Sequence, residues 1–264
     1  MPGGPYDSSR TRVAPVFDRL RARTDEWPRQ LLEVVCPTWS EDSGGGALDL
    51  RFERGYWGET ERGVDPPVSL LSWLIRHPTP QLIAQDRLPE RTRLAQGDPD
   101  TVAAALRLLR TSGSTSGWHL LEGPTYPDAW IETPHALLVV EGKRTEPGPT
   151  VDTTWLSGRH QIWRHLDAAW EVRGRRRVFG FFLVEGGGDG TTVPSHWRRA
   201  FEEARRPEAL ATSFPHRSAA ERDAIAACFL GGSTWQRVCH TFGIPFDTLP
   251  DRIPSASSSG GASE

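Results

Sequence analysis

The sequence predicts an α/β protein in which a mainly helical N-terminal region precedes a mixed sheet flanked by helices. Two observations lead to this class. Apolar residues recur at helical spacing before residue 98, and short β-prone runs begin near residue 118. A second helical pattern and a strongly apolar run follow these strands. We therefore expect the order helix, three strands, helix, strand in the core.

The N-terminal elements and the first core element are predicted as helices. Asp98 or Asp100 can cap the first core helix, and the Thr-Ser-Gly sequence at 111–113 ends it. Glycine and proline clusters separate the earlier helices from one another. The expected helical ranges are 16–23, 27–35, 68–77 and 99–110.

The remaining elements form the predicted sheet and its C-terminal helices. Strands are expected at 118–121, 129–132, 136–143 and 178–184, with a helix at 153–172 before the last strand. Residues 195–240 are expected to be helical in two pieces, and the small polar tail is expected to be disordered. The expected divisions are a helical region at 1–97, a core with C-terminal helices at 98–250, and a tail at 251–264.

The composition restricts the class of protein. The net charge of -3 and the pI of about 6.3 provide no bulk positive field of the kind that nucleic-acid packaging proteins carry. Only three cysteines occur, and no segment approaches the roughly 20 apolar residues of a membrane-spanning helix. We expect a soluble cytoplasmic protein that does not bind membranes, in which any phosphate binding is local.

One basic residue differs from all the others. Among 31 lysines and arginines, Lys143 is the only lysine. Because a compact amine differs chemically from a guanidinium, the single lysine in a chain that otherwise uses arginine indicates that this position needs an amine. Chance in an arginine-rich composition is the alternative explanation.

A predicted hairpin brings Lys143 together with two acidic residues. The turn at 133–135 lies between two β-prone runs, and a turn centred there pairs Asp128 with Glu141. Because side chains alternate across a strand, Asp128, Glu141 and Lys143 project from one face and apolar residues project from the other. The charged face and the core face are expected to be separate.

Two opposed carboxylates need a cation between them. Directly paired residues have Cβ atoms about 5 Å apart, so their charges repel. Oxygen ligands select magnesium or manganese, and the carbonyl of Gly142 is a further candidate ligand. The pattern therefore predicts a divalent-metal site that includes Asp128, Glu141 and Gly142.

These residues resemble the signature of the PD-(D/E)XK nuclease superfamily, which is Pro-Asp followed, after a variable gap, by an acid, any residue and lysine. Here the signature reads Pro127-Asp128 and then Glu141-Gly142-Lys143. The resemblance implies a restriction-endonuclease-like core and covers about a third of the chain. It also implies magnesium-dependent hydrolysis of phosphodiester bonds in DNA, by a monomer or a homodimer.

The resemblance assigns roles to individual residues. Asp128 and Glu141 hold the metal, and Lys143 either orients the attacking water or stabilises the transition state. Gln161 on the following helix faces the site. The family's additional acid has no counterpart on the predicted helix 99–110, which contains no glutamate. The candidates for that acid are Glu122, Glu90 and Glu41.

Two other interpretations remain open. The first is a catalytically silent module that keeps the nuclease fold and binds nucleic acid or protein. The second is an unrelated α/β protein in which Lys143 makes an ordinary cross-strand ion pair, an interaction worth about 0–1 kcal/mol. Distinguishing them requires knowing whether the three side chains meet.

Overall fold

The computed structural model describes most of the chain. The predicted tail beyond Arg252 and the candidate ligand Glu41 lie outside the described residues. No helix in the described part is long and apolar enough to cross a bilayer. The described residues are 7–38, 48–79, 88–112, 117–151, 153 and 155–252.

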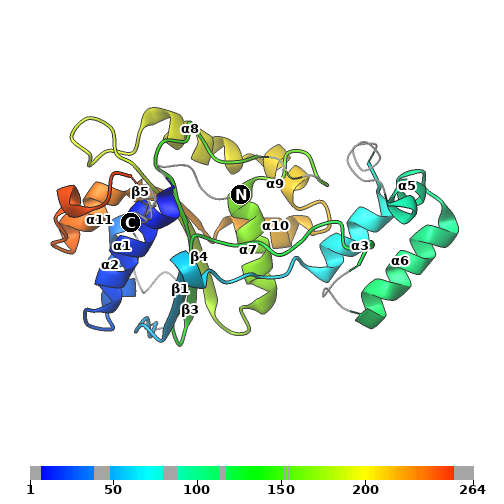
Figure 1. The fold of residues 1–264 in the computed structure, drawn as a ribbon, viewed down its shortest axis with the longest axis horizontal. Helices are drawn as coiled ribbons and strands as arrows, with labels where there is room; N and C mark the ends of the chain where they lie inside the picture. Colours follow the sequence, from blue (N-terminus) through cyan, green and yellow to red (C-terminus); the bar gives the residue numbers. More distant parts are fainter. Residues whose placement is uncertain are drawn as a thin grey trace, which may run out of the picture.

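A five-stranded mixed sheet forms the centre of the molecule (Figure 1). Its strand order follows the chain. The first three strands pair antiparallel, and the third, fourth and fifth pair parallel. The expected α/β class, with a mixed sheet flanked by helices, is confirmed. The strands are β1 (Arg54–Trp57), β2 (Ala129–Glu132), β3 (Ala136–Gly142), β4 (Arg177–Val184) and β5 (Phe229–Thr234).

Two strand assignments from the sequence are wrong. Residues 118–119 lie in a turn and 120–121 have no regular structure. Leu121 is fully buried, and it packs in a cluster formed mostly by helical residues. The first strand is instead β1, which comes from the N-terminal region. β5 lies within residues 195–240, which were expected to be helical in two pieces, and its Gly231-Gly232 pair weakens the strand pattern. Gly232 is required there, because an added Cβ would lie 2.6 Å from the carbonyl oxygen of Phe182.

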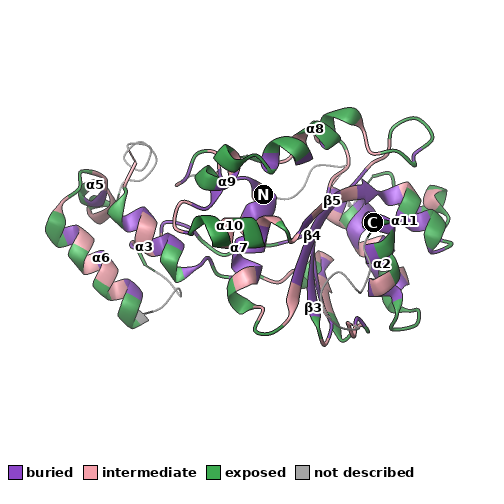
Figure 2. Ribbon diagram, turned by 180° about the vertical axis from the view of Figure 1, so that it is seen from behind, coloured by how far each residue is buried: buried purple, intermediate pink, exposed green. Residues whose placement is uncertain are grey.

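Helices cover both faces of the sheet (Figure 2). One face is covered by the N-terminal helices and the last α-helix. The other face is covered by the helices between β3 and β5. On the first face lie η1 (Ser9–Val13), α1 (Ala14–Arg21), α2 (Trp27–Val35) and α11 (Trp235–Thr241). On the second lie α7 (Gln161–Val172), α8 (Ser195–Ala204), α9 (Pro207–Ser213) and α10 (Ala219–Ala226).

The face that carries Glu141 is not an open charged surface, so that expectation was wrong. Leu137 and Val139 project from the same face of β3 and are fully buried in the cluster that includes α7. A parallel strand pairs with both of its neighbours and is normally covered on both faces, which explains this second core. Glu141 therefore lies at the end of a buried apolar row.

The helix after β3 begins later than the sequence indicates. The expected helix started at residue 153, whereas α7 begins at Gln161. Thr153 closes a turn by accepting a hydrogen bond from the Leu156 backbone at 3.2 Å, and Gly158 has a φ of 75°. The irregular segment ends at His160. This residue caps α7, and its side chain accepts a hydrogen bond from the Ile162 backbone.

A helical lobe lies apart from the sheet (Figure 1). Its core contains Leu70, Leu94 and Leu109, together with Leu121 from the loop before β2. The Asp98 carboxylate caps the last of its helices by accepting from the Thr101 backbone at 2.8 Å. The lobe consists of α3 (Val68–Arg76), α5 (Pro89–Ala95) and α6 (Pro99–Ser112), and the short 3-10 turns η3 (Gly58–Thr60) and η4 (Phe246–Thr248) lie elsewhere.

Candidate functional site

The β2–β3 hairpin has the register that the sequence predicts. Ala129 pairs with Val140 in the antiparallel ladder, so Asp128 and Glu141 are the next opposed positions. On the other side, Glu141 pairs in parallel with Phe182 of β4. The two acids therefore lie near the carboxyl ends of β3 and β4, the edge at which open α/β sheets commonly bind ligands.

Glu141 is the central residue of the cluster. Its side chain is 2% exposed, and its Oε1 atom lies 2.8 Å from Lys143 Nζ and accepts from Gln161 Nε2 at 2.6 Å. Its Oε2 atom lies 3.0 Å from His165 Nε2. Burial on its own raises the pKa of Glu141, but the contacts from His165 and Lys143 outweigh burial and lower the pKa to about 2. Glu141 is therefore an anion.

Asp128 has the opposite electrostatic character. Burial and the negative charge of Glu141 raise the pKa of Asp128 well above its usual value. Lys143 and a hydrogen bond from the Gly142 backbone, at 2.8 Å to Oδ2, only partly oppose this shift. Two interacting carboxylates whose pKa values move apart are typical of a site that holds a cation or a proton.

Glu61 is a third acid that the sequence did not reveal. Burial raises its pKa, and the charges of Glu141 and Asp7 raise it further against a 3.0 Å hydrogen bond from the Ser9 hydroxyl. Its position follows from β1: Trp57 pairs with Ala129, which brings the chain after Trp57 beside Asp128. Because the pairing partners are more than 70 residues apart, no local pattern marks Glu61.

His165 is a further residue of this site that the sequence analysis did not predict. It lies four residues after Gln161, so both side chains lie on the same side of α7 and contact Glu141. The other ring nitrogen, Nδ1, lies 2.6 Å from the Thr125 hydroxyl. A donor at Nε2 toward the carboxylate and an acceptor at Nδ1 satisfy both contacts. The i, i+4 spacing from Gln161 was the available signal.

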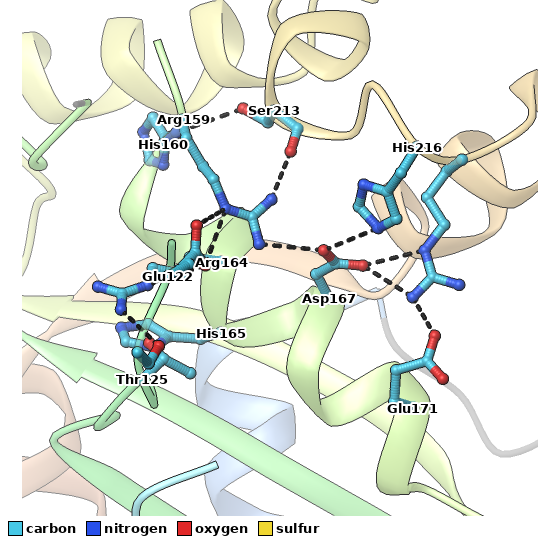
Figure 3. Close-up of polar contacts among 12 residues, drawn as sticks. Glu122, Thr125, Arg159, His160, Arg164, His165, Asp167, Glu171, Ser213 and His216 are labelled. Atoms are coloured by element: carbon cyan, nitrogen blue, oxygen red, sulfur yellow. Dashed lines mark hydrogen bonds and ion pairs between the residues drawn. The ribbon is translucent and has the colours of Figure 1, made fainter. Parts of the chain in front are cut away.

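Glu122 is engaged elsewhere. Its buried carboxylate lies 3.1 Å from Arg159 Nε and 3.2 Å from Arg164 Nε (Figure 3). Arg159 also contacts Asp167 at 3.0 Å, and that acid accepts from Arg217. Glu122 therefore belongs to a buried ion-pair network, and we do not retain it as a metal ligand.

Gly142 and Glu90, the other two candidate ligands, also have identifiable packing or ion-pair contacts. An added Cβ at Gly142 would lie 2.6 Å from Val13 and 2.8 Å from Trp235, so the glycine accommodates the core on the opposite face. Close packing therefore explains this glycine without any approaching substrate. Glu90 lies on α5 in the helical lobe, where Arg93 is 3.7 Å away.

A cleft of about 990 Å³ opens beside Asp128. Its walls are η1, α1 and η3, with Thr145 and Glu146 following β3. Carboxylates outnumber cations in the lining, so an anionic substrate would enter only with accompanying cations. The charged residues of the lining are Asp7, Asp18, Glu59, Glu61, Asp128, Glu146, Arg10 and Arg21.

The donor set fits a hard divalent cation in its chemistry and charge. Asp128, Glu61 and Glu141 are oxygen donors whose charges disfavour one another, and Lys143 supplies a single ammonium group. In the described part of the chain, however, no three His, Cys, Asp or Glu side chains converge as a complete metal site. A bound ion would therefore share Glu141 with its present hydrogen-bond donors.

Comparison of the chain with family models, with curated proteins and with solved structures finds no match.

Proposed function

We propose that the protein is a metal-dependent nuclease with a restriction-endonuclease-like core that hydrolyses phosphodiester bonds in DNA. One observation carries the proposal: Lys143 contacts Glu141, and Asp128 is the opposed residue on the hairpin. The acids and the lysine of the resemblance thus occur together at one edge of the sheet. DNA as the substrate rests on the resemblance.

Magnesium or manganese would be held by Asp128 and Glu141, with Glu61 as the additional acid in place of Glu122. The ion would polarise the phosphate and lower the pKa of an attacking water. The pKa values of Asp128 and Glu61 are raised by burial and by neighbouring carboxylates, so the protein disfavours their negative charges. A bound cation would offset these charges, which supports the assignment.

Lys143 would act as a charged donor. Burial lowers its pKa, but the charges of Glu141 and Asp128 outweigh burial and raise the pKa above its ordinary value. A lysine that holds its proton at neutral pH cannot remove a proton from water. It can stabilise negative charge on the phosphorane and donate to the attacking water's oxygen.

Gln161 and His165 would position Glu141. The Gln161 amide donates to Oε1 and the His165 ring lies against Oε2, so both carboxylate oxygens are fixed in direction. Thr125 in turn contacts the far side of the His165 ring. A carboxylate oriented from both sides presents the same geometry to every substrate molecule.

The test is cleavage of supercoiled plasmid and of single-stranded DNA in Mg²⁺ or Mn²⁺. The variant Glu141→Gln keeps the shape of the side chain and removes its charge, so we expect the rate to fall about 100-fold or more. Glu203→Gln, at an exposed position on α8, is the matched control and is expected to cleave like the unmodified protein. Equal activity of both variants would refute the proposal.

A catalytically silent nuclease-fold module is the second candidate. The observation that favours it is that no complete three-residue metal group forms among the described side chains. The same assay distinguishes the two functions. Binding of DNA without cleavage in either metal would support the silent module.

A further inference from the structure

A second charged cluster is connected to the candidate active site through the Lys143 backbone. Arg144 follows Lys143 in the chain, and Glu185 follows β4. The Glu185 backbone donates to the Lys143 carbonyl at 3.2 Å, which holds the two chain segments side by side. Arg12 from η1 joins them, with Nε and Nη2 donating to the two Glu185 oxygens at 3.1 and 2.9 Å.

The two guanidinium groups are held in place by the protein. Arg12 has a side chain that is 2% exposed, and its Nη1 also donates to the carbonyls of Pro250, at 2.7 Å, and Thr11, at 2.9 Å. The Arg144 side chain is 9% exposed, and its Nε lies 3.9 Å from Glu185. Little side-chain freedom remains to be lost when an anion binds.

The second anion that contacts these two groups is Asp251. Its Oδ1 atom lies 3.0 Å from Arg144 Nη2 and 3.6 Å from Arg12 Nη2, and its carbonyl accepts from Arg144 Nη1. Its side chain is 87% exposed. Two buried cations are thus paired with a carboxylate that is open to water, which screens this side of the ion pair.

We propose that Arg12 and Arg144 form a binding subsite for a phosphodiester group next to the one that is cut, and that Asp251 occupies this subsite in the free protein. The inference rests on the proposed nuclease function. Guanidinium groups bind phosphate and carboxylate with the same paired geometry, so one anion can replace the other. The subsite follows Lys143 in the chain and supplies fixed positive charge, whereas carboxylates outnumber cations in the cleft beside Asp128.

The charge balance supports an exchange of anions. Of the two carboxylates that contact the guanidiniums, Glu185 is held by two hydrogen bonds from Arg12 and is partly buried. Asp251 lies after η4, and its side chain is exposed. When a phosphate displaces Asp251, Glu185 still keeps Arg12 in position. The Glu146 carboxylate nearby accepts from the Arg144 backbone at 2.7 Å, while Arg144 Nη2 donates to Asp251 Oδ1.

The experiment measures DNA binding without cleavage, by fluorescence anisotropy in EDTA with a labelled single-stranded oligonucleotide and the matching duplex. Asp251→Asn removes the competing charge, and we expect binding to strengthen about 3- to 10-fold at low salt, with a smaller gain as salt rises. Arg144→Gln should weaken binding about 10-fold and reduce the salt slope by about one.

The matched control is Asp247→Asn on η4. It removes the same charge from the same segment, at an exposed position four residues from Asp251. We expect its affinity to stay near that of the unmodified protein. An equal gain in both variants would attribute the effect to net charge and overturn the subsite.

The other outcomes are also decisive. If Asp251→Asn changes the melting temperature but not the affinity, the pair only anchors the chain end and the subsite is wrong. If neither oligonucleotide binds the unmodified protein, the subsite fails as well. The three variants could show the expected DNA affinities while the unmodified protein fails to cleave DNA in Mg²⁺. That result would support the subsite and refute the nuclease function.

Discussion

Replacing Asp128 with asparagine should stabilise the protein in the absence of metal and abolish its response to metal. Asparagine has nearly the same shape and keeps an oxygen that can accept from the Gly142 backbone. It removes one of the two opposed charges. The variant therefore separates the electrostatic cost of the site from its packing.

The magnitude follows from the hairpin register. Directly opposed residues have Cβ atoms about 5 Å apart, and two unit charges at that distance repel by about 3 kcal/mol at an effective dielectric constant of about 20. Lys143 offsets part of this repulsion, so we expect Asp128→Asn to gain about 1–2 kcal/mol at neutral pH. In a chain of this size that corresponds to about 2–8 °C in melting temperature.

The gain should depend on pH in one direction. The pKa of Asp128 is raised in the folded state, so the folded protein holds this proton more tightly than the unfolded chain does. Stability from this group is present at acid pH and is lost as pH rises from the ordinary aspartate range through the raised pKa. The advantage of the asparagine variant should therefore be absent near pH 4 and grow toward neutral pH.

The assay is thermal unfolding with EDTA or with Mg²⁺. A ligand at about 100 times its Kd stabilises a protein by about 2.7 kcal/mol, so the unmodified protein should melt about 5–10 °C higher with metal. Asp128→Asn should show no such shift, while Asp223→Asn, at an exposed position on α10, should respond fully. An asparagine variant that is less stable in EDTA at neutral pH, or equally stabilised by Mg²⁺, would refute the reasoning.

Three further variants test the surroundings of the site. Lys143→Arg keeps the charge but not the compact amine, so DNA cleavage should fall about 100-fold with the metal-induced melting shift retained; unchanged cleavage would show that any cation suffices. Gly142→Ala places a Cβ against two core side chains and should cost about 1–3 kcal/mol in denaturant unfolding, whereas a neutral effect would contradict the close packing. Arg159→Leu leaves Glu122 and Asp167 with one buried partner fewer and should cost about 3–5 kcal/mol; a loss below about 1 kcal/mol would show that the network contributes little.

Local patterns in the sequence were sufficient for the hairpin. The turn at 133–135, between two β-prone runs, determines which residues oppose one another, and the observed register agrees. A shift of one residue would have moved Glu141 to the other face of the hairpin. Gln161 likewise meets Glu141, because it begins the helix that packs on that face.

Other parts of the fold could not be predicted from local patterns. The short strand β1 has only four residues, of which only Trp57 is buried, and its pairing with β2 reveals it. β5 contains two glycines, which weaken a strand pattern although backbone contact with β4 requires one of them. Both strands are specified by partners that are distant in the sequence.

The sequence by itself determined that two acids and a lone lysine share one face of a hairpin, because strand geometry is local and has period two. Only the tertiary structure decided which other acids are involved. Pairing with β2 brings β1, and Glu61 after it, to the site, while Arg159 and Arg164 neutralise Glu122. A carboxylate's role depends on the charges within a few ångströms of it, and folding sets those neighbours.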